Sequence, residues 1–131
     1  MFDYLAKFAR EARKNAYCPY SDFAVGAAVL SESGKIYAGA NCENASFGAG
    51  TCAERAALFA ATSHGERKFT AVAVCGGKQG EASEECFPCG ICLQALSEFM
   101  SPDAKILLCA EDGYSVHEFG EFMPKTFSLN K

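Results

Sequence analysis

Two short segments contain the residues best suited to chemistry. The first, TCAER at residues 51–55, places a thiol shortly before a carboxyl group and a guanidinium. The second, PCGICLQ at residues 88–94, places two thiols three positions apart. Cysteines at that spacing on a helix share one face, so their sulfur atoms can bind a single ion. A helix N-terminus also stabilises thiolates, because its unpaired N–H groups and dipole favour negative charge.

Cys52, Cys89 and Cys92 can therefore hold one zinc ion. Three protein ligands on tetrahedral zinc leave a fourth position for water, which is typical of a catalytic site. If Cys52 caps its helix, the Glu54 carboxylate can face the same pocket and act as a general acid and base on that water. Three thiolates leave the centre with a net negative charge, and Arg55 can offset it by hydrogen bonding to the ligand sulfurs.

Cys86 leaves an alternative open, because it forms a second C-x-x-C pair with Cys89. Cys52, Cys86, Cys89 and Cys92 together would close a four-cysteine structural zinc site, and the protein would then be an interaction module. The position of Cys86 before Pro88, outside the expected helix, favours the three-cysteine site. The other cysteines are expected to be small buried residues: Cys18, Cys42, Cys75 and Cys109.

Composition narrows the class of partner. The chain has 131 residues, a length that predicts one domain spanning residues 1–131. Its net charge is −4. An acidic chain without a run of Lys and Arg is not expected to bind nucleic acid or an anionic membrane surface. The charged N-terminal segment lacks the apolar core of a signal peptide. We therefore expect a cytoplasmic protein with reduced thiols.

Helices and strands alternate along the sequence, and they must position these side chains. The pattern predicts an α/β fold in which helices cover a sheet of about five strands. Asp3 is expected to cap the first helix. Helices are expected near residues 3–16, 51–61 and 89–100, a hairpin over 23–40, and strands at 69–75, 104–110 and 114–117.

The two cysteine segments together resemble the zinc-dependent cytidine deaminases, specifically the short form that acts on free nucleosides. The likeness continues through AYCPYS, FAVGA and NCENA, which begin at Ala16, Phe23 and Asn41, and ends with MPKTF at residues 123–127. The family fold is a single three-layer domain with a mixed sheet. The resemblance implies hydrolysis of cytidine and 2'-deoxycytidine to uridine and 2'-deoxyuridine with release of ammonia, in pyrimidine salvage.

The resemblance also implies a role for each matching residue. One zinc ion per chain would be held by the three cysteines and would activate a water molecule, with Glu54 as the proton shuttle. The expected substrate-binding residues are Asn41 and Glu43 on the sugar, Phe23 and Val25 beside the base, Ala53, and Phe127 over the nucleoside of another subunit. That last role implies a homotetramer with shared active sites.

Two positions depart from the family pattern. Leu93 stands where many relatives have Arg, and SFGAG at residues 46–50 replaces a loop that usually contains Tyr. These changes remove no ligand, and the resemblance leaves open the fine substrate preference and the subunit contacts made by that loop. The glycine-rich approach to Cys52 also resembles the blasticidin deaminases. Because those lack the Asn-x-Glu pair that Asn41 and Glu43 supply here, cytidine is the favoured substrate.

Overall fold

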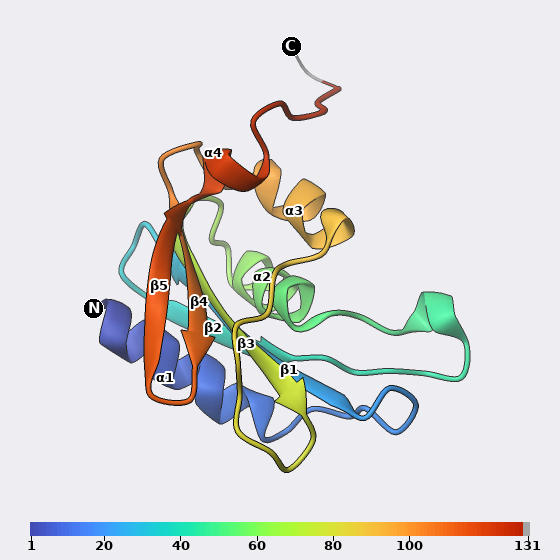
Figure 1. The fold of residues 1–131 in the computed structure, drawn as a ribbon. Helices are drawn as coiled ribbons and strands as arrows, with labels where there is room; N and C mark the ends of the chain where they lie inside the picture. Colours follow the sequence, from blue (N-terminus) through green and yellow to red (C-terminus); the bar gives the residue numbers. More distant parts are fainter. Residues whose placement is uncertain (130–131) are drawn as a thin grey trace.

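A mixed sheet of five strands, in the order β2-β1-β3-β4-β5, forms the centre of the computed structural model, which describes residues 1–129 (Figure 1). β1 and β3 pair antiparallel, β3 and β4 parallel, and both edge strands antiparallel to their neighbours. The strands are β1 (Phe23–Ser31), β2 (Ile36–Ala40), β3 (Phe69–Lys78), β4 (Lys105–Ala110) and β5 (Gly113–Glu118). The predicted α/β fold with about five strands is confirmed.

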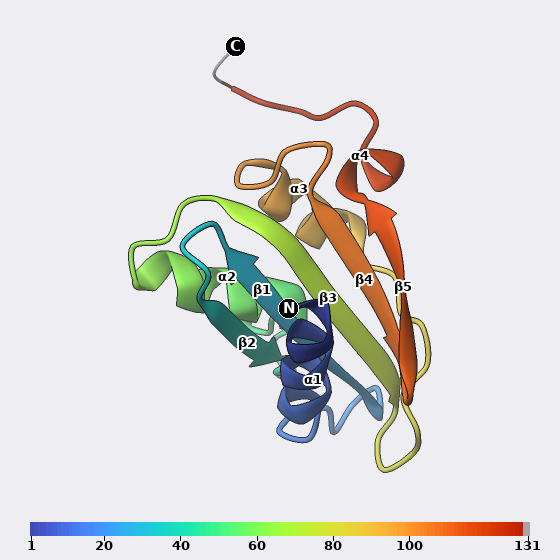
Figure 2. The ribbon, with the colours of Figure 1, turned by 90° about the vertical axis from the view of Figure 1, so that its left-hand side faces the viewer.

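Helices cover both faces of the sheet. α1 (Phe2–Arg13) lies on one face, whereas α2 (Ala53–Ser63) and α3 (Gly90–Ser97) lie on the other. Figure 2 shows α1 in front of the sheet and the other two helices behind it. The middle strands are buried along most of their length, because apolar residues of both strand faces pack against helices. The expected three-layer arrangement is therefore present.

Two glycines allow helices to approach the sheet closely. A Cβ atom on Gly26 would lie 2.0 Å from the carbonyl oxygen of Ala9 in α1. On Gly39 it would lie 2.5 Å from the backbone nitrogen of Ala57 in α2. The distances are far below van der Waals contact, so only glycine fits at either position. Gly39 thus helps to set the position of α2, whose first residues belong to the TCAER segment.

Several local expectations were wrong. Met1, not Asp3, is the N-cap of α1, and the Asp3 carboxylate instead accepts a hydrogen bond from the Tyr114 hydroxyl at 2.7 Å. α3 ends at Ser97 rather than Met100, because the chain turns there and the Phe99 carbonyl accepts a hydrogen bond from the backbone of Phe69 in β3. Two short helices were not predicted: η1 (Phe47–Ala49) and α4 (Phe119–Phe122).

Three of the four cysteines expected to be buried are buried, and one is exposed. Cys18, Cys75 and Cys109 are buried, as predicted. Cys42 is exposed, because it lies in the loop after β2, where its backbone pairs with Thr51. All eight cysteines carry free thiols. No helix within residues 1–129 is long and apolar enough to cross a membrane.

Candidate metal centre and active site

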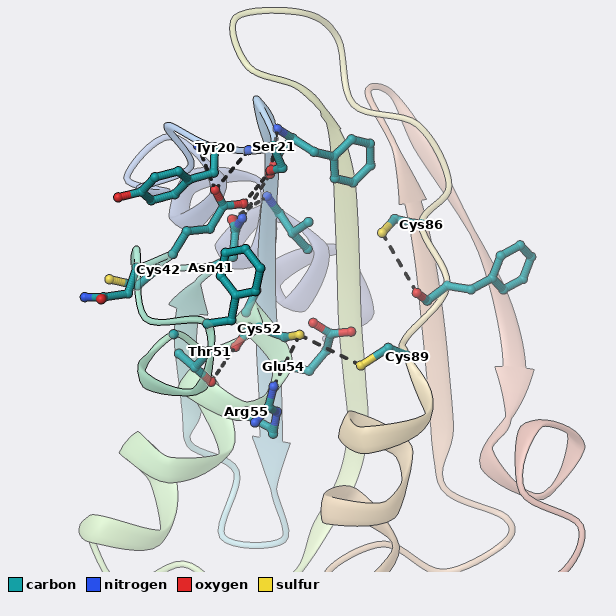
Figure 3. Close-up of a pocket in the computed structure, with 18 residues that line it drawn as sticks. Tyr20, Ser21, Asn41, Cys42, Thr51, Cys52, Glu54, Arg55, Cys86 and Cys89 are labelled. Carbon is teal, nitrogen blue, oxygen red and sulfur yellow. Dashed lines mark hydrogen bonds between the residues drawn. The ribbon is translucent and has the colours of Figure 1, made fainter.

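The N-termini of α2 and α3 meet at one point on the molecule. Cys52 is the N-cap of α2 and Cys89 the N-cap of α3, and both have extended backbones with ψ near 160° (159° and 165°). A residue at this position has left the helical path, so its side chain does not follow the 100° helical step. Cys52 and Glu54 therefore face one pocket, as expected if Cys52 caps the helix (Figure 3).

Short pairings fix both helix starts. The backbones of Cys42 and Thr51 exchange two hydrogen bonds of 3.0 Å just before α2. Gly76 at the end of β3 pairs with Glu84, which ties the segment leading to Cys89 against the sheet. The two cysteine segments are thus tied to the same end of the sheet, where β2 and β3 finish on either side of the start of β1, although Cys52 and Cys89 are 37 positions apart in the sequence.

The sulfur atoms of Cys52, Cys89 and Cys92 all lie within 4.8 Å of one another. The Cys52 and Cys89 sulfurs are 3.8 Å apart. Two thiolates bound to tetrahedral zinc at about 2.3 Å lie about 3.8 Å apart, so the spacing fits zinc. Among residues 1–129 this is the one group of three or more potential ligand side chains gathered in this way. Cys86 lies outside it, with its sulfur 4.0 Å from the carbonyl oxygen of Phe87.

The electrostatics of these thiols favour a bound cation. Burial raises the pKa of Cys92 well above its ordinary value, and the nearby Glu54 carboxylate raises it further. Burial also acts to raise the pKa of Cys89, but hydrogen bonds from the backbone N–H of Cys92 and from neighbouring thiols outweigh it, so that this pKa is lowered. A cation bound at the cluster would offset this effect and favour the thiolate form of Cys92.

Arg55 supplies positive charge behind the sulfurs. Its Nη2 atom lies 3.5 Å from the Cys52 sulfur. Hydrogen bonds raise the pKa of the guanidinium above its ordinary value. The bond to Cys52 has the largest effect, and the bond to Cys92 the next largest. Its Nε atom is buried and has no hydrogen-bond partner within the part of the chain that the structure describes. An anionic thiolate cluster gives this half-buried guanidinium a partner, which is a second reason why the site fits a zinc–thiolate centre.

Glu54 is a buried carboxyl group at the edge of the same cluster, with an exposed fraction of only 4%. Burial raises its pKa, and the smaller effects of its backbone N–H and of Arg55 oppose this. Figure 3 shows its carboxylate between the sulfurs of Cys52 and Cys89. A carboxyl group in this position can exchange protons with a molecule held in front of the cysteines.

A cavity of about 620 Å³ opens in front of Glu54 and the cysteines. The structure brings most of the sequence-predicted substrate-binding residues to its walls: Phe23, Val25, Asn41, Glu43 and Ala53. Phe127 is not among the lining residues. The residue is 65% exposed, and its carbonyl oxygen accepts a hydrogen bond of 3.3 Å from the Gln94 side chain.

Asn41 also has a structural task that sequence reasoning missed. Its Oδ1 atom accepts a hydrogen bond of 2.8 Å from the Val25 backbone, and its Nδ2 atom donates one of 2.9 Å to the Phe23 carbonyl. These two bonds hold the start of β1 in place. One Nδ2 hydrogen remains for a ligand, because an amide nitrogen carries two.

The cavity has further wall residues that sequence reasoning did not assign: Tyr20, Ser21, Phe47, Cys86 and Phe87. Tyr20 and Ser21 lie in the AYCPYS segment, whose match to the family was a signal that could have found them. Phe47 lies in the SFGAG segment, whose departure from the family pattern was its signal, whereas no comparable signal marks Phe87 in the segment before α3.

Comparison with protein families agrees with this geometry. The model of the cytidine and deoxycytidylate deaminase zinc-binding region matches residues 2–108. A cytidine deaminase of Halalkalibacterium halodurans is 46% identical over 104 residues, covering 79% of this chain and 76% of its own. One from Sporosarcina psychrophila is 45% identical over 100 residues, covering 76% and 71%.

Solved structures give the same result. The crystal structure of cytidine deaminase from Burkholderia pseudomallei superposes with a TM-score of 0.85 at 40% identity, covering 97% of this chain and 99% of that one. The structure of cytidine deaminase from Mycobacterium tuberculosis gives a TM-score of 0.80 at 35% identity, with 98% of each chain covered. The similarity therefore extends over nearly the whole described fold.

Proposed function

The chain belongs to the cytidine and deoxycytidylate deaminase family, and on that premise we propose that it hydrolyses cytidine and 2'-deoxycytidine to uridine and 2'-deoxyuridine with release of ammonia. The observation that carries the proposal is the buried Glu54 carboxyl group beside three clustered cysteine sulfurs, of which Cys52 and Cys89 line the cavity together with Glu54. The cavity is large enough for a nucleoside, since ligand pockets typically have volumes of about 300–1,000 Å³.

Cys52, Cys89 and Cys92 hold one zinc ion per chain in this proposal. When bound, zinc supplies Lewis-acid chemistry that lowers the pKa of a water molecule. Arg55 offsets the excess negative charge of the thiolates through its contact with the Cys52 sulfur. The two helix N-termini act in the same direction, because Cys52 and Cys89 lie at the positive ends of the helix dipoles.

Glu54 carries the protons of the reaction. It accepts a proton from the water that attacks C4 of the pyrimidine and donates it to N3. It then takes the remaining hydroxyl proton and delivers it to the amino group at C4. The C4–N bond breaks, ammonia leaves, and a carbonyl group remains at C4. Its burial suits this work, because shielding from water raises the pKa of a carboxyl group toward neutral pH. Such a group can both accept and release a proton there.

The cavity walls bind the nucleoside. Phe23 and Val25 lie beside the base, where aromatic and aliphatic surfaces suit a flat neutral ring. Asn41 and Glu43 hydrogen-bond the sugar hydroxyls, and Ala53 contacts the substrate. No cationic patch is needed for such a ligand, which agrees with the net charge of −4.

The assembly in this proposal is a homotetramer with shared active sites, in which Phe127 covers the nucleoside of a neighbouring subunit. The η1 segment and the C-terminal tail extend furthest from the sheet (Figure 1). They carry exposed apolar side chains: Phe47 at 88%, Phe127 at 65% and Leu129 at 85%. Contact with other subunits would bury this surface. The free thiols support a reducing, cytoplasmic location for this domain of residues 1–131. A role in pyrimidine salvage follows from the proposed reaction, which returns uridine from cytidine.

Zinc content and turnover test the proposal together. We expect the purified protein to contain about one zinc ion per chain and to convert cytidine and 2'-deoxycytidine, measured by ultraviolet absorbance. The Glu54→Gln variant should keep its zinc but lose at least about 10²-fold in kcat, because it cannot carry protons. Full activity of Glu54→Gln would contradict the mechanism.

Two cysteine variants separate the enzyme from a four-cysteine structural site. Cys92→Ser should lose zinc, because its sulfur belongs to the cluster. Cys86→Ser should retain both zinc and activity, because its sulfur lies outside the cluster. Loss of zinc from Cys86→Ser, together with no turnover of any nucleoside by the parent protein, would favour the structural module.

A further inference from the structure

The Glu43 carboxylate is held by the loop that precedes β1. Its Oε1 atom accepts hydrogen bonds of 3.1 Å from the backbone N–H groups of both Tyr20 and Ser21. Its Oε2 atom accepts a hydrogen bond from the Ser21 hydroxyl. A carboxylate offers about four acceptor sites, so roughly one remains free, on Oε2. Glu43 also lines the cavity, which makes that site available to a ligand.

The direction of the Ser21 hydroxyl is fixed by its second partner. Its oxygen accepts a hydrogen bond of 3.0 Å from the backbone N–H of Phe23. Because an N–H group can only donate, the hydroxyl oxygen must accept there, and its own proton is left for the Glu43 carboxylate. The arrangement favours the ionised form of Glu43, because hydrogen bonding by the Ser21 side chain is the main reason why the pKa of Glu43 is lowered.

The backbone adopts an unfavourable conformation to maintain this geometry. Asp22, between Ser21 and Phe23, has φ = 58°, in the left-handed region that L-residues seldom adopt. This conformation turns the chain back so that the Phe23 N–H reaches the Ser21 oxygen. The turn is tied down on both sides, since the Asp22 N–H donates to the Cys18 carbonyl and its own carbonyl accepts from Gln79. Strain that surrounding bonds maintain in this way is typical of a functional site.

We propose that Ser21 is a positioning residue for substrate binding: its hydroxyl orients the Glu43 carboxylate so that Oε2 accepts one sugar hydroxyl of the bound nucleoside. The assignment rests on the proposed function, since it takes the ligand of Glu43 to be a sugar. It makes Ser21 a determinant of nucleoside affinity without contact with the reacting atoms. Removing the hydroxyl should therefore weaken binding and leave the chemical step intact.

The test compares two substrates on the Ser21→Ala variant. We expect kcat/KM for cytidine to fall about 5-fold to 20-fold, mostly through KM, with kcat within about 2-fold of the parent. For 2',3'-dideoxycytidine, which lacks the 2' and 3' hydroxyls that we take as the ligands of Glu43, kcat/KM should change less than about 2-fold. Ser21→Thr, which keeps a hydroxyl, should restore the KM for cytidine. A loss of general structural integrity would reduce turnover of both substrates equally.

A double-mutant cycle gives a second readout. In a Glu43→Gln background, Ser21→Ala should raise the KM for cytidine by less than about 2-fold, because the carboxylate that Ser21 orients is absent. Ser33→Ala is the matched control, since Ser33 also donates to a carboxylate, that of Glu66 at 2.9 Å, and neither residue lines the cavity. It should leave the KM for both substrates unchanged.

Either of two outcomes would overturn the assignment. Equal losses on both substrates would show a structural role, and additive effects of Ser21→Ala and Glu43→Gln would show that the two residues act independently. If Ser21→Ala does not fold, Ser21→Cys, whose thiol is a weak donor, carries the same comparison. A parent protein with no activity on cytidine would instead overturn the proposed function, and is distinguished from the other outcomes by that measurement alone.

Discussion

Arg55 is the residue at which charge balance can be tested most directly. It lies three positions after Cys52 in the first turns of α2, so its guanidinium can reach back to the Cys52 sulfur at 3.5 Å. Three thiolates around one divalent ion leave a net negative charge in a partly buried site, and Arg55 is the cation in contact with it. Removing that cation should weaken the hold of the cysteines on zinc.

We therefore expect Arg55→Gln to lower zinc affinity by about 10-fold to 100-fold, the usual effect of losing a partner that hydrogen-bonds to metal ligands. Competition with a chelator, followed by turnover at saturating zinc, measures this. Arg67→Gln is the matched control, because Arg67 also lies near α2 but donates to the backbone carbonyls of Thr62 and Glu66. Unchanged zinc affinity in Arg55→Gln would contradict the role.

At the level of single residues, short-range chemistry could be predicted from the sequence. Cys52, Cys89 and Cys92 were predicted as a cluster because each segment indicates a helix start by itself. The backbone contacts of Asn41 could not be predicted, because they depend on the alignment of β1 with the loop after β2. The exposure of Cys42 has the same origin, since the burial of one cysteine depends on the path of the whole loop.

Among the elements, α2 links the stability of the fold to the site. Its backbone at Ala57 approaches Gly39 of β2 so closely that an added Cβ atom would lie 2.5 Å from the Ala57 nitrogen. Gly39→Ala should push α2 away from the sheet and destabilise the protein by about 1–3 kcal/mol, as overpacking usually does. Because Cys52 caps this helix, zinc affinity should fall as well.

Urea unfolding of the zinc-free protein and chelator competition measure the two effects separately. Gly113→Ala is the matched control, since an added Cβ at Gly113 meets no atom within 4 Å. If Gly39→Ala left both the free energy of unfolding and zinc affinity unchanged, close packing of α2 on β2 would not position the site.

The strands and the starts of the helices were largely predictable, and the ends of elements were not. Pro88 and the cysteines mark the beginning of α3, but its end at Ser97 is set by a long-range hydrogen bond between Phe99 and Phe69. η1 and α4 are too short to show a periodic pattern in the sequence. The weak edge strand expected over 114–117 is present as β5, because β4 supplies a pairing partner along its whole length.

For the whole molecule, the position of Phe127 links the assembly of subunits to substrate binding in the active site. The other predicted substrate-binding residues line the cavity of one chain, whereas the Phe127 ring is exposed outside it. The tail that carries it projects away from the sheet (Figure 1). If Phe127 covers the nucleoside in a neighbouring subunit, each site is completed by a second copy of the chain.

Mixing two defective variants tests this directly. Phe127→Ala should raise the KM for cytidine about 3-fold to 10-fold through loss of an aromatic contact, whereas Glu54→Gln is expected to be inactive. In co-expressed assemblies, an intact Glu54 in one subunit can be completed by Phe127 from a Glu54→Gln neighbour. The KM of the mixture should therefore move back toward that of the parent. Co-expression with the double variant Glu54→Gln/Phe127→Ala is the control and should give no such recovery.

The alternative arrangements predict different results because they place Phe127 differently. If the tail folds back over its own cavity, every active site in the mixture lacks the ring, and the KM stays at the Phe127→Ala value. If Phe127 only packs at a subunit interface, Phe127→Ala should reduce the assembly size measured by sedimentation without changing KM in the assembled fraction. Recovery of KM in the mixture requires the ring of one chain to act in the site of another, because no subunit there has both Glu54 and Phe127 intact.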